Sequence, residues 1–286
     1  MDGNDLRNRL SAGSVLMPGV WDALSARLAS NAGFDVVFIS GYATAGTQLG
    51  LPDFGYLTQT EIADVARRVC GAIPDTCVVV DGDTGYGNAL NTIRTVQLYE
   101  AAGAAGIFLE DQVWPKRCGH MEGKRVVPVG EWLSKLEAAL STRKALFVVA
   151  RTDARAAVDI DEACDRARQA AKLGVDAIFV EAPQGTDEMK AIADATPNTI
   201  RVANMVEGGK TPLLTPKELH RLGYDLVVSP LTGLLASTKA LADAYGTLQA
   251  EGSLRDHLDT VAGFEEFGTL VDLERHYQLD ARYRSE

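Results

Sequence analysis

The sequence has little positive charge. It carries 28 Lys and Arg residues against 39 Asp and Glu residues, which gives a formal net charge of -11 at pH 7. A surface with this excess of negative charge repels the phosphates of nucleic acid, so we expect no nucleic-acid partner. The charge does not argue against a small anionic substrate, because a local cluster of metal and arginine can override the overall field.

Long apolar runs and paired cysteines are also missing. No apolar stretch approaches the ~18 residues that a membrane span requires, and the start, Met1-Asp2-Gly3-Asn4-Asp5, lacks the basic region and apolar run of an export signal. The four cysteines have no metal-ligand spacing, and free thiols are typical of a chain without an export signal. We therefore expect a cytoplasmic protein without a membrane partner.

What the sequence does contain is a series of short, continuous apolar runs, which are typical of strands buried on both faces of a parallel sheet. Segments between them have helical patterns, as at residues 61–69, 92–102 and 161–173, and several of these segments end in a glycine that can cap a helix. The capping glycines are Gly33, Gly103, Gly174 and Gly223. The apolar runs centre on residues 15–17, 36–39, 78–80, 107–109, 146–149, 177–180, 200–203 and 226–228.

Eight strands that alternate with helices predict a (β/α)₈ barrel, a TIM barrel of the α/β class. A doubly wound open sheet is the competing fold, but the Gly-rich phosphate-binding turn expected after its first strand is absent. We expect one barrel domain over residues 1–286, with roughly 238–286 as a C-terminal helical extension. The extension is expected to hold a helix from residue 238, a Gly-containing turn and a helix over 265–277, and to cover a neighbouring subunit.

Polar residues follow six of the predicted strands directly, where a barrel of this kind builds its active site. The segments are Ser40-Gly41-Tyr42, Asp81-Gly82-Asp83, Glu110-Asp111, Arg151-Thr152-Asp153, Glu181 and Asn204. The sequence therefore predicts an acidic barrel mouth that contains one arginine.

Three acids at this mouth, Asp81, Asp83 and Glu110, are the oxygen ligands that Mg²⁺ or Mn²⁺ prefers. The alternative is that the two aspartates only cap the following helix or stabilise a turn. The planar guanidinium of Arg151 is suited to bind a substrate carboxylate, although it could also be a structural partner for one of the acids.

One thiol lies between charged residues, in Lys116-Arg117-Cys118-Gly119-His120. Cationic neighbours lower the pKa of a thiol, and nearby glycines let the segment move as a lid. Cysteine is also a common buried apolar residue, as we expect for Cys70, Cys77 and Cys164, but no apolar run surrounds Cys118. His120 is either a solvated loop residue or a group that tunes the proton of the thiol.

These motifs resemble the isocitrate lyase / phosphoenolpyruvate mutase superfamily over nearly the whole chain. The resemblance implies a (β/α)₈ barrel with Mg²⁺, a gating loop, and a C-terminal helix exchanged between subunits in the dimers of a homotetramer. The Cys-containing loop resembles that of the carbon–carbon lyases, and Met121-Glu122-Gly123-Lys124 is closer to 2,3-dimethylmalate lyase and the petal death protein than to methylisocitrate lyase. The matching segments are Ser40–Tyr42, Pro52-Asp53-Phe54-Gly55, residues 81–87, 110–112, 116–120 and 151–154, Glu181-Ala182-Pro183 and Asn204-Met205.

The resemblance implies a lyase that cleaves a 2-hydroxy dicarboxylate of the 2-alkylmalate, 2,3-dimethylmalate or methylisocitrate type to an α-keto acid and a carboxylate. Cys118 would protonate the carbanion, with its pKa set by Lys116, Arg117 and His120. Tyr42 would assist removal of the hydroxyl proton, and Arg151 would act beside the metal site of Asp81, Asp83 and Glu110. The substrate-binding residues would be Ser40, Gly41, Tyr42, Asp53, Gly119, His120, Arg151, Glu181, Asn204 and Thr232.

Three other functions are compatible with the same residues. Oxaloacetate hydrolysis or decarboxylation would use the same metal and carboxylate-binding groups. Phosphonopyruvate or phosphoenolpyruvate chemistry occurs in the superfamily, and Cys118 argues against it. A non-catalytic barrel would be expected to lose a cluster of like charges that is costly to keep.

Overall fold

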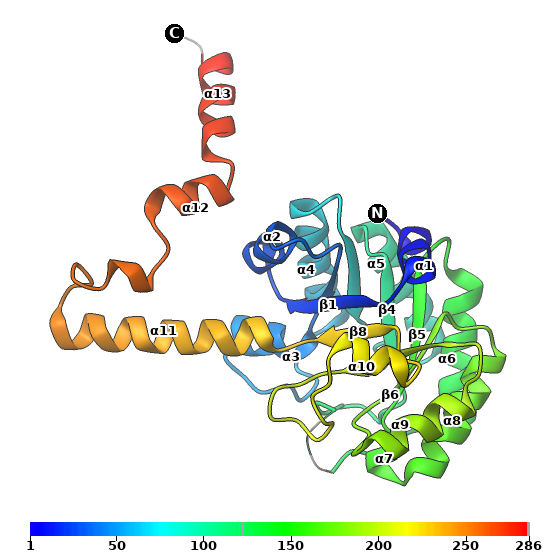
Figure 1. Ribbon diagram of the computed structural model, residues 1–286. Helices are drawn as coiled ribbons and strands as arrows, with labels where there is room; N and C mark the ends of the chain where they lie inside the picture. The colour runs from blue at the N-terminus through cyan, green and yellow to red at the C-terminus, as the bar shows by residue number, and fades with distance from the viewer. Residues whose placement is uncertain (120, 122, 285–286) are drawn as a thin grey trace. The chain divides into compact units, whose positions relative to one another are not determined.

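A computed structural model of the protein describes residues 1–119, 121 and 123–284. The chain forms two compact units, Met1–Gly233 and Leu234–Glu286. Every strand of the described residues lies in the first unit, and its architecture positions the candidate site (Figure 1).

Eight parallel strands close into a barrel in sequence order, with β1 paired to both β2 and β8. The predicted (β/α)₈ fold is therefore confirmed, and each predicted apolar run overlaps one strand. The strands are β1 (Val15–Val20), β2 (Val36–Ile39), β3 (Cys77–Asp81), β4 (Gly106–Glu110), β5 (Phe147–Thr152), β6 (Ala177–Val180), β7 (Ile200–Asn204) and β8 (Leu226–Ser229).

Helices alternate with these strands in the chain and surround the barrel (Figure 1). The four glycines expected to follow helices all have positive φ, between 83° and 94°, as a left-handed helix end requires. The helices of this unit are α1 (Gly3–Ala12), α2 (Ala23–Asn31), α3 (Gly41–Thr44), the π-helical turn Ala45–Leu49, α4 (Gln59–Ala72), α5 (Ala89–Ala102), α6 (Val129–Thr142), α7 (Ala154–Ala157), α8 (Ile160–Lys172), α9 (Thr186–Ala195) and α10 (Pro216–Arg221).

Side chains alternate along the strands between two apolar layers. On β3, Cys77 and Val79 join the cluster inside the barrel, whereas Val78 and Val80 join the larger cluster that includes the surrounding helices. Leu6 and Leu10 of α1 also belong to the inner cluster. Because α1 begins against the backbone at the start of β4 and β5, it covers the N-terminal end of the barrel and leaves the C-terminal end for the site.

The second unit is helical. After α11 (Thr232–Glu251), which begins in the first unit, come a 3₁₀ turn (Leu258–Thr260), α12 (Phe264–Leu270) and α13 (Leu273–Tyr283). The helix expected from residue 238 starts earlier, because Pro230 ends β8 and the chain turns into the helix at Thr232. The single helix expected over 265–277 is two, because Asp272 has left-handed backbone angles, with φ at 57°.

Within the described residues, no helix combines the length and the apolar character that crossing a membrane requires.

Candidate active site

A pocket opens at the carboxyl ends of the strands, where the sequence placed the site. Its floor is apolar: the rings of Phe38 and Phe108 are 4.9 Å apart, and those of Phe108 and Phe179 are 5.6 Å apart. Val206, Val228, Pro230 and Leu231 complete the apolar lining. The polar lining is Ser40, Tyr42, Asp53, Asp81, Lys116, Cys118, Gly119, Arg151, Glu181 and Asn204.

The turn after β2 lies close to the acids of β3. The hydroxyl of Ser40 accepts a hydrogen bond from the Ala43 N–H at 3.2 Å, which caps the short helix α3. A Cβ atom on Gly41 would lie 2.9 Å from Asp81 Oδ2, so only glycine lets this backbone approach the carboxylate so closely. The turn therefore brings backbone amide groups beside Asp81.

An acidic cluster, which we define as Asp53, Asp81, Asp83 and Glu110, surrounds Lys116. The Lys116 Nζ lies 2.8 Å from Asp53 Oδ2 and 2.6 Å from Asp83 Oδ1, and all three side chains are buried. Burial raises the pKa of Asp83 to about 7, even though Lys116 opposes this shift. Burial alone would lower the pKa of Lys116, but the carboxylates, led by Asp83 and Asp53, hold it well above its usual value. One ammonium therefore serves several carboxylates.

Glu110 lies at the edge of this cluster and also touches Arg151, whose Nε is 3.3 Å from Glu110 Oε2. Its other oxygen, Oε1, is buried and has no hydrogen-bond partner within residues 1–119, 121 and 123–284. Burial raises the pKa of Glu110 well above its usual range, although Arg151 opposes the shift. A buried carboxylate oxygen in this state lacks a positive charge or a donor.

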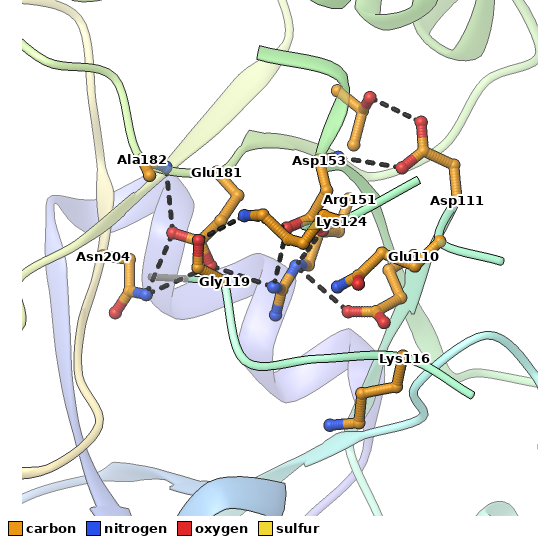
Figure 2. A network of polar contacts seen from close by, with 12 residues as sticks. Glu110, Asp111, Lys116, Gly119, Lys124, Arg151, Asp153, Glu181, Ala182 and Asn204 are labelled. Atoms are coloured by element: carbon orange, nitrogen blue, oxygen red, sulfur yellow. Dashed lines mark hydrogen bonds and ion pairs between the residues drawn. The ribbon is translucent and has the colours of Figure 1, made fainter. Parts of the chain in front are cut away.

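Next to Glu110 lies a balanced cluster, which we define as Arg151, Lys124, Asp153 and Glu181 (Figure 2). Arg151 Nε is 2.9 Å from Asp153 Oδ2, and its Nη2 is 3.1 Å from Glu181 Oε2. Lys124 Nζ is 2.8 Å from Asp153 Oδ1. Burial would raise the pKa of Asp153, but Arg151 and Lys124 outweigh it and hold the pKa well below its usual range. Arg151 therefore pairs with acids of the protein, which is the alternative that the sequence left open for it.

The loop that carries Cys118, which follows β4, contributes Lys116, Cys118 and Gly119 to the pocket lining. The Cys118 N–H donates to the Asp53 backbone oxygen at 3.3 Å, and the half-buried thiol residue lines the pocket. The side chain of Gln112 bonds both backbone groups of Arg117, at 2.8 and 3.0 Å. His120, which we expected to tune the thiol, falls outside the described residues.

Most predicted site residues are brought together. Asp53, Glu181 and Asn204 line the pocket with Tyr42, and Asn204 Nδ2 donates to both Glu181 oxygens at 3.3 Å. Thr232 is not part of the lining; it is exposed and its hydroxyl contacts Glu207 and Ser229. Pro230 and Leu231, two residues of the same turn, line the pocket instead.

Sequence reasoning assigned no role to Lys124 or Asp153. Asp153 was visible as the last residue of the Arg151-Thr152-Asp153 segment, two positions from the arginine. Side chains two apart on a strand share a face, so this spacing was a usable signal. Lys124 had no comparable signal, because its position depends on how the loop folds back.

A divalent metal fits the acidic cluster. Within the described residues, no three His, Cys, Asp or Glu side chains stand close enough together to hold a metal by themselves. Mg²⁺, however, commonly takes one or two carboxylates and completes its shell with water and substrate oxygens. The buried, unpartnered Glu110 oxygen is an acceptor that a cation could satisfy. The donor set of Asp81, Asp83 and Glu110 therefore suits a hard cation.

Named relatives match nearly the whole chain. A protein from Arabidopsis thaliana named carboxyvinyl-carboxyphosphonate phosphorylmutase, chloroplastic, is 51% identical over 95% of this chain and 81% of its own length. The petal death protein of Dianthus caryophyllus is 48% identical, over 96% and 86%. The 2,3-dimethylmalate lyase of Eubacterium barkeri is 42% identical, over 94% and 93%.

Solved structures of similar proteins have the same fold over nearly the whole chain. A crystal structure of 2,3-dimethylmalate lyase and one of oxaloacetate acetylhydrolase with 3,3-difluorooxalacetate both superpose with a TM-score of 0.92 at 30% identity. Each covers 98% of this chain, with 94% and 96% of the solved chain covered in turn. A phosphonopyruvate hydrolase complex with oxalate and Mg²⁺ superposes with a TM-score of 0.87 at 27% identity, over 99% of each chain.

The family model described as phosphoenolpyruvate phosphomutase matches residues 6–248. This match spans the barrel and the strand ends that form the pocket. The chain is therefore an enzyme of the phosphoenolpyruvate mutase / isocitrate lyase superfamily.

Proposed function

We propose that this enzyme cleaves a carbon–carbon bond in a 2-hydroxy dicarboxylate of the 2-alkylmalate, 2,3-dimethylmalate or methylisocitrate type. The products are an α-keto acid and a second carboxylate. The observation that carries the proposal is the position of Cys118, which lines the same pocket as Asp81 and Arg151. A thiol there can exchange a proton with a substrate held between the two charged clusters.

Mg²⁺, or Mn²⁺ in its place, is the proposed cofactor, held by Asp81 directly and by Asp83 and Glu110 directly or through water. When bound, the ion would lower the pKa of the substrate's 2-hydroxyl group and stabilise the carbonyl oxygen that forms there. The Mg²⁺ in the related phosphonopyruvate hydrolase structure supports this assignment.

Arg151 and the backbone of Ser40, Gly41 and Tyr42 would orient the substrate's carboxylates. Arg151 is held by Asp153 and Glu181, so its guanidinium keeps one orientation before substrate arrives. Tyr42 lines the pocket and would assist removal of the 2-hydroxyl proton. The remaining substrate contacts we propose are Asp53, Gly119, His120, Glu181 and Asn204.

The bond between C2 and C3 then breaks. Electrons of the O–H bond form the new carbonyl at C2, and the electrons of the broken bond stay on C3 as a carbanion conjugated with its carboxylate. The Cys118 thiol donates its proton to C3, and the thiolate that remains regains a proton before the next cycle. Lys116, Arg117 and His120 are proposed to favour the thiolate. Exclusion of water by the loop protects the carbanion until it is protonated.

Alkyl groups on the substrate have an apolar place to bind. Val206, Pro230 and Leu231 line the pocket and are all buried. Burial of one methylene against such a surface contributes ~0.8 kcal/mol, which supports an alkyl-substituted malate as the substrate class.

Oxaloacetate hydrolysis is the second candidate, because the oxaloacetate acetylhydrolase structures superpose as well as those of the lyase. Product analysis separates the candidates. We would incubate the wild-type enzyme and Mg²⁺ with 2-alkylmalates, 2,3-dimethylmalate, methylisocitrate, oxaloacetate and phosphonopyruvate. An α-keto acid from a 2-hydroxy dicarboxylate supports the lyase. Oxalate from oxaloacetate with no other cleavage would move the enzyme to the hydrolases, and turnover of phosphonopyruvate alone would overturn both proposals.

We also propose that the active form is a homotetramer made of helix-swapped dimers. In the second unit, α13 has no buried residue, and large apolar side chains such as Leu241, Tyr245 and Phe264 are exposed. Exposed apolar surface of this extent marks an interaction site. Sedimentation of the full chain tests this, with the mass of four chains expected and the mass of one chain contradicting it.

A cytoplasmic location is part of the same proposal. The Arabidopsis relative is named as chloroplastic, so fractionation of the source cells is the direct test.

A further inference from the structure

Lys124 lies in a loop, yet its side chain is only 1% exposed. Its Nζ donates to the backbone oxygen of Gly119 and lies 2.8 Å from Asp153 Oδ1 (Figure 2). A buried ammonium is strongly unfavourable unless charged or polar partners replace water. The two acceptors therefore account for a lysine at this place.

The two acceptors belong to different parts of the site. Gly119 follows Cys118 directly in the loop, whereas Asp153 follows β5 and holds the guanidinium of Arg151 at 2.9 Å. The ammonium of Lys124 thus connects the loop backbone next to Cys118 to Asp153, the partner of Arg151.

Gly119 also packs tightly against the balanced cluster. A Cβ atom on Gly119 would lie 2.3 Å from Glu181 Oε2, much closer than real Cβ contacts allow. The loop can lie in this position only because residue 119 has no side chain. The same stretch of backbone therefore also lies close to the balanced cluster at Glu181.

The base of the loop is held by bonds that do not involve Lys124. Gln112 and Val126 form a bridge, and the Val127 N–H donates to the Asp111 backbone oxygen at 2.9 Å. Arg166 Nη1 then donates to the Val127 oxygen at 2.9 Å. The Cys118 N–H also keeps its bond to the Asp53 oxygen without Lys124. Loss of Lys124 should therefore loosen the backbone from Gly119 onward, next to Cys118, and leave the base of the loop in place.

Arg151 also keeps its partners without Lys124. Asp153 contacts Arg151 through both carboxylate oxygens, and the Asp153 N–H donates to Asp111 Oδ1 at 2.8 Å. The group that would orient the substrate's carboxylate is therefore supported independently of the loop.

We propose that Lys124 is a positioning residue that holds Cys118 over the pocket by joining Gly119 to Asp153. Its kinetic consequence rests on the proposed lyase function, whereas its effect on the exposure of the thiol does not. Without the ammonium, Cys118 spends less time at the substrate and more time in solvent. The proton-transfer step slows, and substrate binding by Arg151 is retained.

The first test measures the reactivity of the thiol. Iodoacetamide alkylation of Cys118, followed by peptide mass spectrometry, is compared between the wild type and Lys124→Met. We expect alkylation to be about tenfold faster or more in the variant, since a buried hydrogen bond to a charged group is lost. Cys70, Cys77 and Cys164, the other free thiols, serve as internal references. The control variant is Lys144→Met, which removes an exposed lysine.

Gly119→Ala provides a second variant that changes no charge. Its Cβ should displace the same backbone from Glu181 and expose Cys118 in the same way. If Lys124→Met does not fold, as judged by circular dichroism, Lys124→Gln retains a donor for one acceptor and replaces it. Faster alkylation in Gly119→Ala with an unchanged rate in a folded Lys124 variant would overturn the proposal.

The second test separates kcat from KM on whichever substrate the wild type cleaves. We expect kcat of Lys124→Met to fall about tenfold or more while KM stays within about threefold. A rise in KM with kcat unchanged would contradict the positioning role and make Lys124 a substrate-binding residue. If the wild type cleaves no 2-hydroxy dicarboxylate, the proposed function fails, and the alkylation rates still decide the role of Lys124.

Discussion

The two charged clusters that flank the pocket differ in their balance. The balanced cluster sets Arg151 and Lys124 against Asp153 and Glu181, and the pKa of Asp153 is held below its usual range. The acidic cluster has Lys116 as its own cation and a contact from Arg151 to Glu110 against four carboxylates, and burial raises the pKa of Asp83 to about 7.

This difference indicates two tasks. A cluster in which every charge is matched is rigid before substrate binds, so it is suited to orient groups. A cluster that is short of positive charge needs a cation to keep its carboxylates ionised together. We infer that the balanced cluster holds the loop and the substrate, and that the acidic cluster binds the metal.

The largest expected effect comes from removing that cation. Chelation of Mg²⁺ should lower the activity by about 10⁴-fold, because a bound divalent ion supplies several kcal/mol of stabilisation to developing negative charge. Thermal melting gives a readout that does not depend on activity. Mg²⁺ should raise the melting temperature of the wild type and of Lys144→Met, and should not raise that of Asp81→Asn. Equal shifts in all three proteins would show that the ion binds elsewhere.

Breaking the balanced cluster should mainly reduce stability. Asp153→Asn leaves the buried charges of Arg151 and Lys124 without their shared partner, which should lower the free energy of unfolding by about 3 kcal/mol. Denaturant titration measures this loss. Glu188→Gln, which removes a carboxylate from the partly exposed pair with Arg155, is the matched control and should lose less than about 1 kcal/mol.

The pH dependence sharpens this prediction. Because Asp153 has a pKa below its ordinary 3.8 when folded, the unfolded chain takes up the proton first as the pH falls. The stabilisation by its carboxylate is therefore fully present above about pH 4 and is lost as the pH drops through the folded pKa. The difference in unfolding free energy between wild type and Asp153→Asn should therefore be smaller at about pH 3 than at about pH 5. An equal difference at the two pH values would contradict the lowered pKa.

A smaller effect is expected when charge is kept and shape is changed. Arg151→Lys retains the positive charge but cannot contact Asp153 and Glu181 through a planar fork, so kcat/KM should fall by about 30-fold, or about 2 kcal/mol. Arg155→Lys makes the same change in the pair with Glu188, outside the pocket lining. Arg155→Lys should leave kcat/KM within about twofold of the wild type. Equal losses of kcat/KM in the two variants would contradict the role of the Arg151 guanidinium in the pocket.

Much of the barrel could be predicted because its strands obey a local rule. The runs at Val36–Ile39 and Ala177–Val180 are continuous and apolar, and both became strands with those bounds. The rule that parallel strands present their carboxyl ends at one mouth then placed Asp81 and Arg151 in one pocket. The break between α12 and α13 could not be predicted, since Asp272 adopts a left-handed conformation that aspartate rarely takes.

Lys124 shows the corresponding limit within the site. Its partner Asp153 is 29 residues away in the chain, and they meet only because the loop returns along the segment that begins at Gln112. Local pattern carries no information about such a contact. The position of Lys124 therefore had to come from the folded structure.

The most direct test of the central claim is the cleavage rate of Cys118→Ser with a 2-alkylmalate and saturating Mg²⁺. Cys70→Ser is the control, because that thiol lies on α4 and burial raises its pKa to about 11. The account predicts that Cys70→Ser forms α-keto acid at the wild-type rate and that Cys118→Ser is slower by about 10²–10⁴-fold. α-Keto acid release by Cys118→Ser at the wild-type rate would contradict the role of this thiol as the proton donor.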